Sequence, residues 1–199
     1  MEDNGKSVLQ YVAAIVGGIC AKVRRHRDVP EKWVWVRLGD IILYDLGGGT
    51  PSKQEDTYWV NGNIPWMTVK DYPKTSIFVS DTLEHITEKG LNNSSTNLIV
   101  NNSIIVCTRV GLGKICINEV PVAINQDLRA LFLPCCINKM FFIHFYKTVL
   151  VEGKGTTVKG IKRDELLNFL IPLPPLAEQH RIVAKLEKLL PLCDGLVEK

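Results

Sequence analysis

The sequence predicts an α+β fold: a curved, mainly antiparallel sheet and a few helices, flanked by N- and C-terminal helices of coiled-coil type. Many short apolar runs separated by glycine and asparagine turns indicate the strands. Two longer stretches near the ends repeat apolar residues at helical spacing instead. We therefore expect a helix over residues 1–28, a folded domain over 29–174 and a second helix over 175–199.

The N-terminal stretch has a helical apolar stripe with basic residues near its C-terminal end, where the helix dipole favours them. Gly17 and Gly18 lower its intrinsic stability by about 2 kcal/mol, so we expect it to need packing, for instance against the helix after Pro175. The apolar run 8–21 is too short to span a bilayer and follows acidic residues, which argues against a membrane segment or signal peptide.

The composition limits the possible functions. A chain of 199 residues with 46% hydrophobic content can form one domain with an additional helix or two. Its net charge is only +3, so any nucleic-acid surface must come from local clusters, and basic residues gather in segments 22–37 and 147–163. The six cysteines form neither a zinc motif nor a disulfide pattern, which indicates reduced thiols and a cytoplasmic location.

The central region reads as short strands joined by turns. Trp33 to Leu38 alternates large apolar residues, and Gly39 and Asp40 suit a short helical turn. The further strands expected are 64–69, 77–79, 98–100, 103–109, 114–117 and 128–133. Residues 44–53 and 153–160 are expected to be loops, and 140–151 a buried helix. Residues 81–91 are ambiguous, with a helical turn that Gly90 would end.

The sequence lacks the usual catalytic signatures. The Walker, dinucleotide-binding, Gly-x-Ser-x-Gly and zinc-ligand patterns all fail, and the four histidines are scattered. We therefore expect a binding protein rather than an enzyme, without a metal or cofactor.

Three polar loops carry cations together with hydroxyl and amide groups: 50–53, 108–114 and 153–159. Segments 68–71 and 125–127 have similar chemistry. Arginine and lysine match guanine in the DNA major groove, and glutamine or asparagine matches adenine. The candidate DNA contacts are Thr50, Ser52, Lys53, Thr68, Lys70, Arg109, Lys114, Gln126, Lys154, Thr156 and Lys159. The alternative is that the glycines only make turns and that Arg109 pairs with an acid.

The C-terminal stretch predicts a strand, a proline stop and a helix. Prolines after Ile171 should end the strand, and Pro175 suits the start of a helix. The helix has an apolar seam that we expect to form a subunit interface: Ile182, Leu186, Leu189, Cys193 and Leu196. Pro191 should kink or interrupt it. The alternative is a terminal helix folded onto its own domain.

The segment Pro-Leu-Pro-Pro-Leu-Ala-Glu-Gln-His-Arg-Ile-Val, residues 172–183, resembles the junction between a target recognition domain and the conserved spacer helix in specificity subunits of type I restriction-modification enzymes. Further segments are similar to that family's pattern: 33–40, 48–52, 58–59, 62–66, 108–114, 125–126 and 155–157. The resemblance covers residues 29–199.

This resemblance implies a non-catalytic subunit whose recognition domain reads one half of a bipartite DNA site. Its helix would dock methyltransferase subunits, with a restriction and translocase subunit completing the complex and supplying the ATP-driven cleavage. Such subunits usually carry two recognition domains, whereas this sequence has one, which implies either pairing with a second copy or a fragment of a longer subunit. The competing hypothesis is a protein-interaction module, such as a methyltransferase-binding half-subunit or decoy, without DNA affinity of its own.

Overall fold

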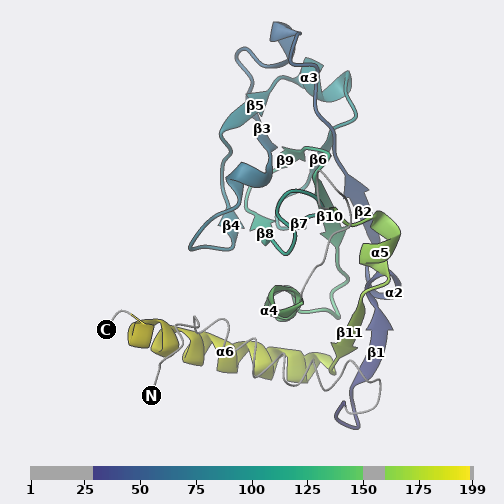
Figure 1. Cartoon of the computed structure of the whole chain (residues 1–199), viewed down its shortest axis with the longest axis vertical. Coiled ribbons are helices and arrows are strands. Elements are labelled where there is room, and N and C mark those ends of the chain that lie inside the picture. Colours follow the sequence, from purple (N-terminus) through teal and green to yellow (C-terminus); the bar gives the residue numbers. More distant parts are fainter. Residues whose placement is uncertain (1–28, 150–159, 198–199) are drawn as a thin grey trace. The chain divides into compact units, whose positions relative to one another are not determined.

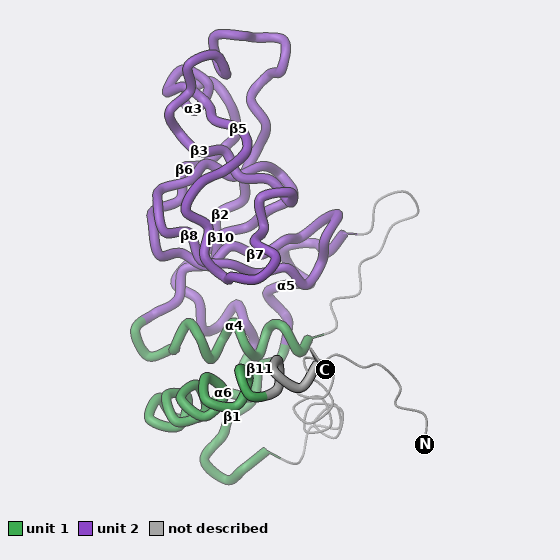
Figure 2. Tube along the Cα trace, turned by 90° about the vertical axis from the view of Figure 1, so that its left-hand side faces the viewer, with its two compact units in different colours: residues 1–36, 135–149, 170–199 green, residues 37–134, 150–169 purple. Residues whose placement is uncertain are grey.

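A computed structural model describes residues 29–149 and 160–197, with side chains to residue 192 (Figure 1). The helix expected over residues 1–28 lies outside the described residues. The chain divides into two compact units that do not follow sequence order (Figure 2). Unit 1 combines described residues from Met1–Val36, Cys135–Val149 and Leu170–Lys199, and unit 2 combines those from Arg37–Pro134 and Leu150–Phe169. The predicted domain boundaries at residues 29 and 174 stay a prediction.

Unit 2 contains two sheets. The five-stranded sheet has the order β2-β10-β7-β8-β4, and the four-stranded sheet has the order β5-β3-β9-β6. Their strands are β2 (Tyr44–Gly47), β3 (Ile64–Met67), β4 (Phe78–Val79), β5 (Glu84–Ile86), β6 (Asn97–Ile99), β7 (Ile104–Cys107), β8 (Ile115–Asn118), β9 (Val122–Ile124) and β10 (Leu128–Phe132). Most pairs are antiparallel, while β3 with β9 and β4 with β8 are parallel. The predicted α+β class with mainly antiparallel pairing is confirmed.

The core of unit 2 explains why β7 and β8 were predictable. Every residue of these two strands is buried, and they consist largely of isoleucine, valine and cysteine. β-branched residues pack well on a pleated surface, so they favour strands here. A cluster that includes Met67, Ile105, Cys116 and Leu128 fills the core of this unit.

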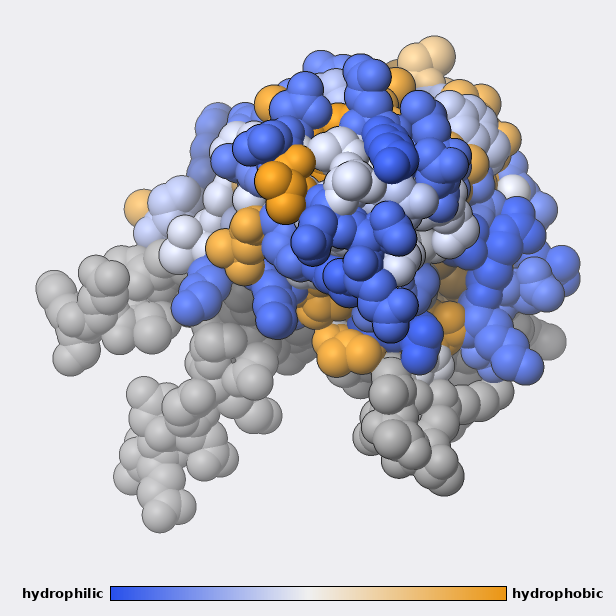
Figure 3. All heavy atoms as spheres, turned by 90° about the horizontal axis from the view of Figure 1, so that it is seen from above, coloured by the Kyte–Doolittle hydropathy of each residue, from blue (hydrophilic) through white to orange (hydrophobic). Residues whose placement is uncertain are grey.

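Short helical segments complete unit 2: α2 (Leu38–Ile41), η1 (Asp56–Tyr58), η2 (Val69–Asp71), α3 (Glu88–Asn92) and α5 (Arg163–Leu167). The turn expected at Gly39 and Asp40 is therefore present. Gly90 lies within α3 and does not end it, because Thr87 caps the helix and Asn93 follows its last residue. Seen from above in Figure 3, the surface around α3 is mainly hydrophilic with scattered apolar side chains.

Two strands of unit 2 differ from the sequence-based predictions. Residues 44–47, expected in a loop, form β2, and β9 was not predicted. β2 pairs with β10 through residues more than 80 positions away, such as Phe132 with Tyr44. That pairing depends on tertiary structure and leaves no local signal in the sequence.

Unit 1 pairs β1 (Val34–Arg37) with β11 (Leu170–Leu173) and packs α4 (Lys139–Thr148) across α6 (Leu176–Val197) (Figures 1 and 2). The expectation that prolines end the strand after Ile171 was wrong for Pro172, which lies within β11, but the strand does end at Leu173, directly before Pro174 and Pro175. A two-stranded sheet leaves one side of each strand unpaired, which tolerates the missing N–H of proline.

Helix α6 begins directly after Pro175, whose carbonyl accepts hydrogen bonds from the N–H groups of Glu178 at 2.8 Å and Gln179 at 3.0 Å. The helix continues through Pro191, so it is not interrupted there, and a kink at this position stays a prediction. No helix in the described part of the chain is long and apolar enough to cross a membrane.

The exposure of α6 side chains bears on the predicted seam. Val183 is buried, so the alternative that α6 packs within its own unit is observed for this face. Ile182 and Leu186 are half-buried, whereas Leu189 is 45% exposed. The side chains of Cys193 and Leu196 lie outside the described residues, and the coiled-coil character of α6 stays a prediction.

Candidate nucleic-acid interface

The site is built where strands of unit 2 end. β3 and β9 are parallel, with Met67 opposite Ile124, so their carboxyl ends lie at the same edge of the sheet. The N–H of Asn125 donates to the carbonyl of Met67 at 3.0 Å, which places the turn after β9 beside Thr68. Two predicted segments, 68–71 and 125–127, are therefore neighbours.

The ends of β7 and β2 meet the same turn. Thr108, which follows β7, donates from its N–H to the Asp127 carbonyl at 2.7 Å and from its hydroxyl at 3.0 Å. Gly49, which follows β2, donates to the Ile124 carbonyl at 3.0 Å. We call residues 48–50, 68–71, 108–114 and 125–127 the strand-end cluster, because all of them follow the carboxyl ends of four strands of one unit.

The two residues that directly follow the third predicted loop pair with the strand-end cluster. Gly160 forms an antiparallel bridge with Arg109, and the N–H of Ile161 donates to the Thr108 carbonyl at 2.9 Å. Lys154, Thr156 and Lys159 themselves lie outside the described residues, so their part in the site stays a prediction.

Gly48 and Gly49 serve close packing at this site. A Cβ atom on Gly48 would lie 1.9 Å from the Ile124 carbonyl oxygen, and one on Gly49 would lie 2.0 Å from Oγ of Ser95. Neither residue has a positive φ. Gly48 therefore lets the end of β2 approach β9, and Gly49 lets the chain approach Ser95, whereas the sequence indicated only the flexibility of a loop.

Thr50 and Gln126 are joined directly. The Thr50 hydroxyl donates to Oε1 of Gln126 at 2.5 Å, and both residues are exposed. An amide whose oxygen is engaged in this way has a defined orientation, with its NH₂ group available as a donor. The pair presents a fixed polar edge to solvent.

Arg109 lies beside Asp127 in the strand-end cluster. Its Nε is 3.6 Å from Oδ1 of Asp127, and the Arg109 side chain is 48% exposed against 16% for Asp127. The alternative that Arg109 pairs with an acid is thus partly realised. The distance exceeds that of a hydrogen bond, so the guanidinium donors remain available to a ligand.

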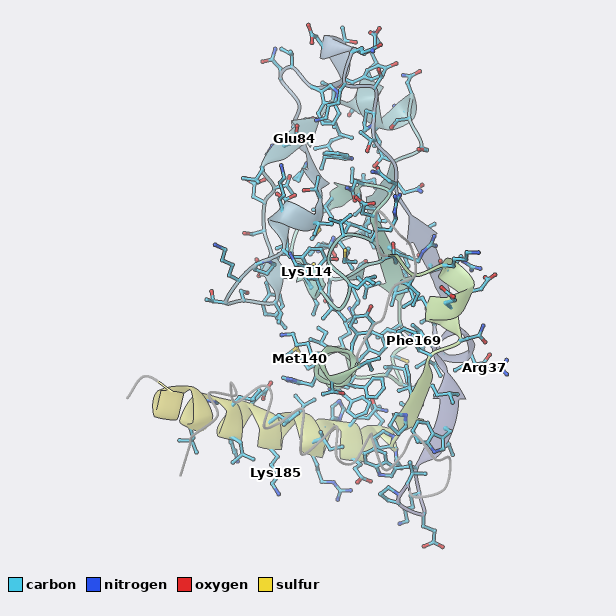
Figure 4. The ribbon with its side chains drawn as sticks, viewed as in Figure 1. Arg37, Glu84, Lys114, Met140, Phe169 and Lys185 are labelled. Carbon is cyan, nitrogen blue, oxygen red and sulfur yellow. The ribbon has the colours of Figure 1, made fainter. Side chains whose placement is uncertain are left out.

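The turn between β7 and β8 is tied to the segment after β3. Nζ of Lys114 donates to the Val69 carbonyl at 3.3 Å and lies 5.7 Å from the Tyr72 ring centroid (Figure 4). Thr68 caps this segment by accepting from the N–H of Lys70 at 3.2 Å, while Asp71 accepts from Thr68. Lys70 and Lys114 are both exposed, so both lysines are placed to meet an anion.

Ser52 and Lys53 are engaged elsewhere in unit 2. Lys53 forms an ion pair with Glu84, and its Nζ lies 3.3 Å from the Trp59 ring centroid (Figure 4 labels Glu84). The Trp59 indole N–H donates to the Ser52 carbonyl at 2.9 Å. Of the eight predicted contacts that the structure describes, these two are the ones outside the strand-end cluster.

Two residues that hold the site were not among the candidate DNA contacts, although Asp127 lies in the predicted segment 125–127. The backbone carbonyl of Asp127 accepts hydrogen bonds from Thr108, and its carboxylate lies beside Arg109, as described above. Cys107 donates its thiol hydrogen to the Arg109 carbonyl at 2.6 Å, and burial raises the pKa of this thiol to about 11, so it remains a donor at neutral pH. The Asn-Gln-Asp turn was a visible signal for Asp127, but nothing local distinguished Cys107.

The strand-end cluster has the chemistry of recognition. It offers hydroxyl, amide, guanidinium and ammonium groups, with Asp71 and Asp127 as nearby carboxylates. Within residues 29–149 and 160–197, no group of three or more His, Cys, Asp and Glu side chains is arranged to hold a metal ion. The arrangement fits hydrogen bonding to a polar ligand.

Comparisons with known proteins agree on one family. Residues 30–198 match the family described as the type I restriction modification DNA specificity domain. The chain is 36% identical over 174 residues to the Escherichia coli type I restriction enzyme EcoR124I/EcoR124II specificity subunit, which covers 82% of this chain and 42% of that relative. It is 28% identical to the MjaIX specificity subunit of Methanocaldococcus jannaschii, covering 79% of this chain and 38% of that relative.

Solved structures share the fold. The HsdS subunit from Thermoanaerobacter tengcongensis aligns with a TM-score of 0.66 at 18% identity, over 94% of this chain and 50% of that one. A chain in a solved structure described as "Structural basis underlying complex assembly and conformational transition of the type I R-M system" aligns with a TM-score of 0.74 at 22% identity. The alignment covers 96% of this chain and 47% of that one. The present chain thus spans about two fifths of the length of the curated relatives above.

Proposed function

The chain belongs to the family of type I restriction-modification DNA specificity domains, and from this premise we propose that its strand-end cluster reads one half of a bipartite DNA target. The observation that carries the proposal is the convergence of four strand ends, described above, around residues 125–127. It gathers Thr50, Thr68, Lys70, Arg109, Lys114 and Gln126, which come from four separate segments of the sequence.

The proposed roles follow from the chemistry of base edges. Arg109 reads guanine through its free donors, and Gln126, oriented by Thr50, reads adenine through its amide. Lys70 and Lys114 contact phosphates, which would position the domain without adding sequence information. Lys154, Thr156 and Lys159, in the loop that precedes Gly160, are proposed as further DNA contacts.

We further propose that the chain has no catalytic role of its own. Methyl transfer and DNA cleavage would belong to methyltransferase and restriction subunits docked on α6. The exposed Leu189 and Leu192 support such docking, since these residues are 45% and 68% accessible on a helix whose buried described residues are Gln179 and Val183. A second copy of the chain is the other helical partner that this surface suits.

The test is selection of DNA from a library of random duplexes by the full-length chain, alone and with its methyltransferase subunit. We expect a defined half-site to be enriched and its affinity to fall steeply with salt. Binding that is equally weak for all duplexes in both arms would overturn the proposal. Tight binding to the methyltransferase subunit without any enriched sequence would support the protein-interaction module instead.

A further inference from the structure

Val110, in the turn between β7 and β8, has an unfavourable backbone conformation. Its φ is 54°, in the left-handed region, where a β-branched residue is a genuine outlier. Among the described non-glycine residues, the others with positive φ are Asn61 and Asn102. Asparagine tolerates this region and valine does not. The strain at Val110 therefore calls for a reason.

The same side chain is also exposed. Val110 is 59% accessible to solvent, so its methyl groups gain little from burial in the protein. Gly111 follows directly, and Gly113, with φ of 88° and no neighbouring atom within 4 Å of where a Cβ would lie, takes another left-handed position of the turn. A glycine or asparagine at position 110 would suit the turn better than valine does.

The surrounding contacts hold Val110 in this conformation. The carbonyl of Arg109, on one side, accepts the Cys107 thiol at 2.6 Å. The carbonyl of Gly111, on the other side, accepts from the N–H of Lys114 at 3.2 Å. A Cβ on Gly111 would lie 2.9 Å from Val69, so the turn is closely packed there. Strain persists where neighbouring structure determines it in this way, and such positions concentrate at functional sites.

The location of Val110 indicates which ligand group it meets. It lies next to Arg109 in the strand-end cluster, so two exposed methyl groups stand among hydrogen-bond donors. In the DNA major groove, thymine presents a methyl group beside the hydrogen-bonding edges of the other bases. Relying on the proposed function, we infer that Val110 is a specificity-determining residue that packs its methyl groups against the C5-methyl of a thymine in the half-site.

Another exposed valine provides a matched control. Val100 is also 59% exposed, but it follows β6, which runs antiparallel to β9 with Ile99 opposite Val122. Val100 therefore lies at the opposite edge of that sheet from Gln126, away from the strand-end cluster. Its φ is not positive. Substitution there changes exposed apolar surface without changing the proposed contact.

The experiment replaces each thymine of the selected half-site in turn by uracil, which lacks only the methyl group. Affinities of the full-length wild-type chain, Val110→Asn and Val100→Asn are then measured, with the methyltransferase subunit where selection required it. At one position the wild type should bind the uracil duplex about fourfold more weakly, the effect of one buried methyl group. Val110→Asn should bind both duplexes equally, and Val100→Asn should discriminate as the wild type does.

Thermal unfolding supplies a second readout. Val110→Asn should raise Tm by about 2–4 °C, because asparagine relieves the left-handed strain at this position. Equal wild-type binding to thymine and uracil at every position would overturn the inference, as would unchanged discrimination in Val110→Asn. Failure to enrich any sequence is a different result, which rejects the proposed function and this inference with it.

Discussion

The hydroxyl of Thr50 donates a hydrogen bond to Oε1 of Gln126 at 2.5 Å, joining residues 76 positions apart. Thr50 follows β2 and Gln126 follows β9, so this bond links strands of different sheets in unit 2. It also sets which edge of the Gln126 amide is available. The relationship makes Thr50 a positioning residue for Gln126.

We therefore predict coupling between these residues in DNA binding. Gln126→Ala should weaken binding to the selected half-site by about 1–3 kcal/mol, the usual value of a base-reading pair. Thr50→Val should lose part of this energy, and the double variant should lose no more than Gln126→Ala alone. Thr50→Ser, which keeps the hydroxyl, is the control. Additive losses measured by fluorescence anisotropy would contradict the orientation role.

Arg109 and Lys114 should make different kinds of DNA contact, Arg109 to a base and Lys114 to a phosphate. Arg109→Ala should weaken binding to the selected half-site by about 1–3 kcal/mol and relax preference at one base pair. Lys114→Ala should weaken binding to all duplexes similarly. It should also reduce the slope of log affinity against log salt concentration by about one, the loss of one phosphate contact. Affinity titrations at several salt concentrations on matched and mismatched duplexes separate the two effects. An equal loss on every duplex for Arg109→Ala would make it a phosphate contact.

Gln179 should be a major contributor to the stability of unit 1. It is 1% exposed; its Oε1 accepts from the N–H of Asn138 at 2.8 Å, and its Nε2 donates to the Pro174 carbonyl at 3.0 Å. Gln179→Leu should lower the free energy of unfolding by about 2–4 kcal/mol, because buried backbone groups lose their partners. Urea denaturation measures the change.

Lys185 provides the control for that experiment. It is exposed and extends from the side of α6 opposite α4 (Figure 4). Lys185→Leu should change the free energy of unfolding by less than about 0.5 kcal/mol. Similar losses in the two variants would mean that the hydrogen bonds of Gln179 contribute little.

Asp45 should make the stability of unit 2 depend on pH. Its side chain is 2% exposed and binds both Arg163, with Nη2 to Oδ1 at 2.6 Å, and Arg129. Burial alone would raise the pKa of Asp45, but the hydrogen bonds and charges of the two arginines lower it below its ordinary value of 3.8. The folded state therefore binds this proton more weakly than the unfolded state.

It follows that the contribution of Asp45 is fully present above about pH 4 and is lost as pH falls through the lowered value. Asp45→Asn should cost about 2 kcal/mol at pH 7, a moderate figure because Arg129 and Arg163 keep partial exposure. The difference from wild type should shrink as denaturation is measured at successively lower pH below about 4, because the carboxylate of the folded wild type is protonated as pH falls through its lowered pKa. Asp164→Asn, at an 88% exposed side chain, is the control, and a pH-independent difference would contradict the linkage.

Leu189 should matter for association and not for folding. It is 45% exposed on α6, so Leu189→Glu should leave the free energy of unfolding of the single chain within about 0.5 kcal/mol of wild type. It should weaken binding to the methyltransferase subunit, because a charge would be placed in an apolar contact. Mass measurement of the mixed subunits tests this, with Lys188→Gln as the control. Unchanged complex formation would exclude this seam as the docking surface.

The sequence alone was sufficient for features with a local signal. The strands around residues 103–109 and 114–117 were predicted because their apolar, β-branched runs are continuous, and most of their residues are buried in the structure. The helix over 140–151 was indicated by its apolar composition, and α4 occupies Lys139–Thr148. The family followed from short, distinctive motifs around Gly48, Arg109 and Pro175.

Tertiary structure decided the rest. Residues 44–47 became a strand because β10 offers them hydrogen-bonding partners more than 80 positions away, and Gly48 is required because β9 approaches within contact distance. The sequence identified polar residues suited to DNA but not which of them meet: Lys53 is held by Glu84, while Thr50 reaches Gln126. Local propensity depends on neighbours in the chain, whereas a binding site depends on which strand ends share an edge, and only the pairing of the sheets sets that.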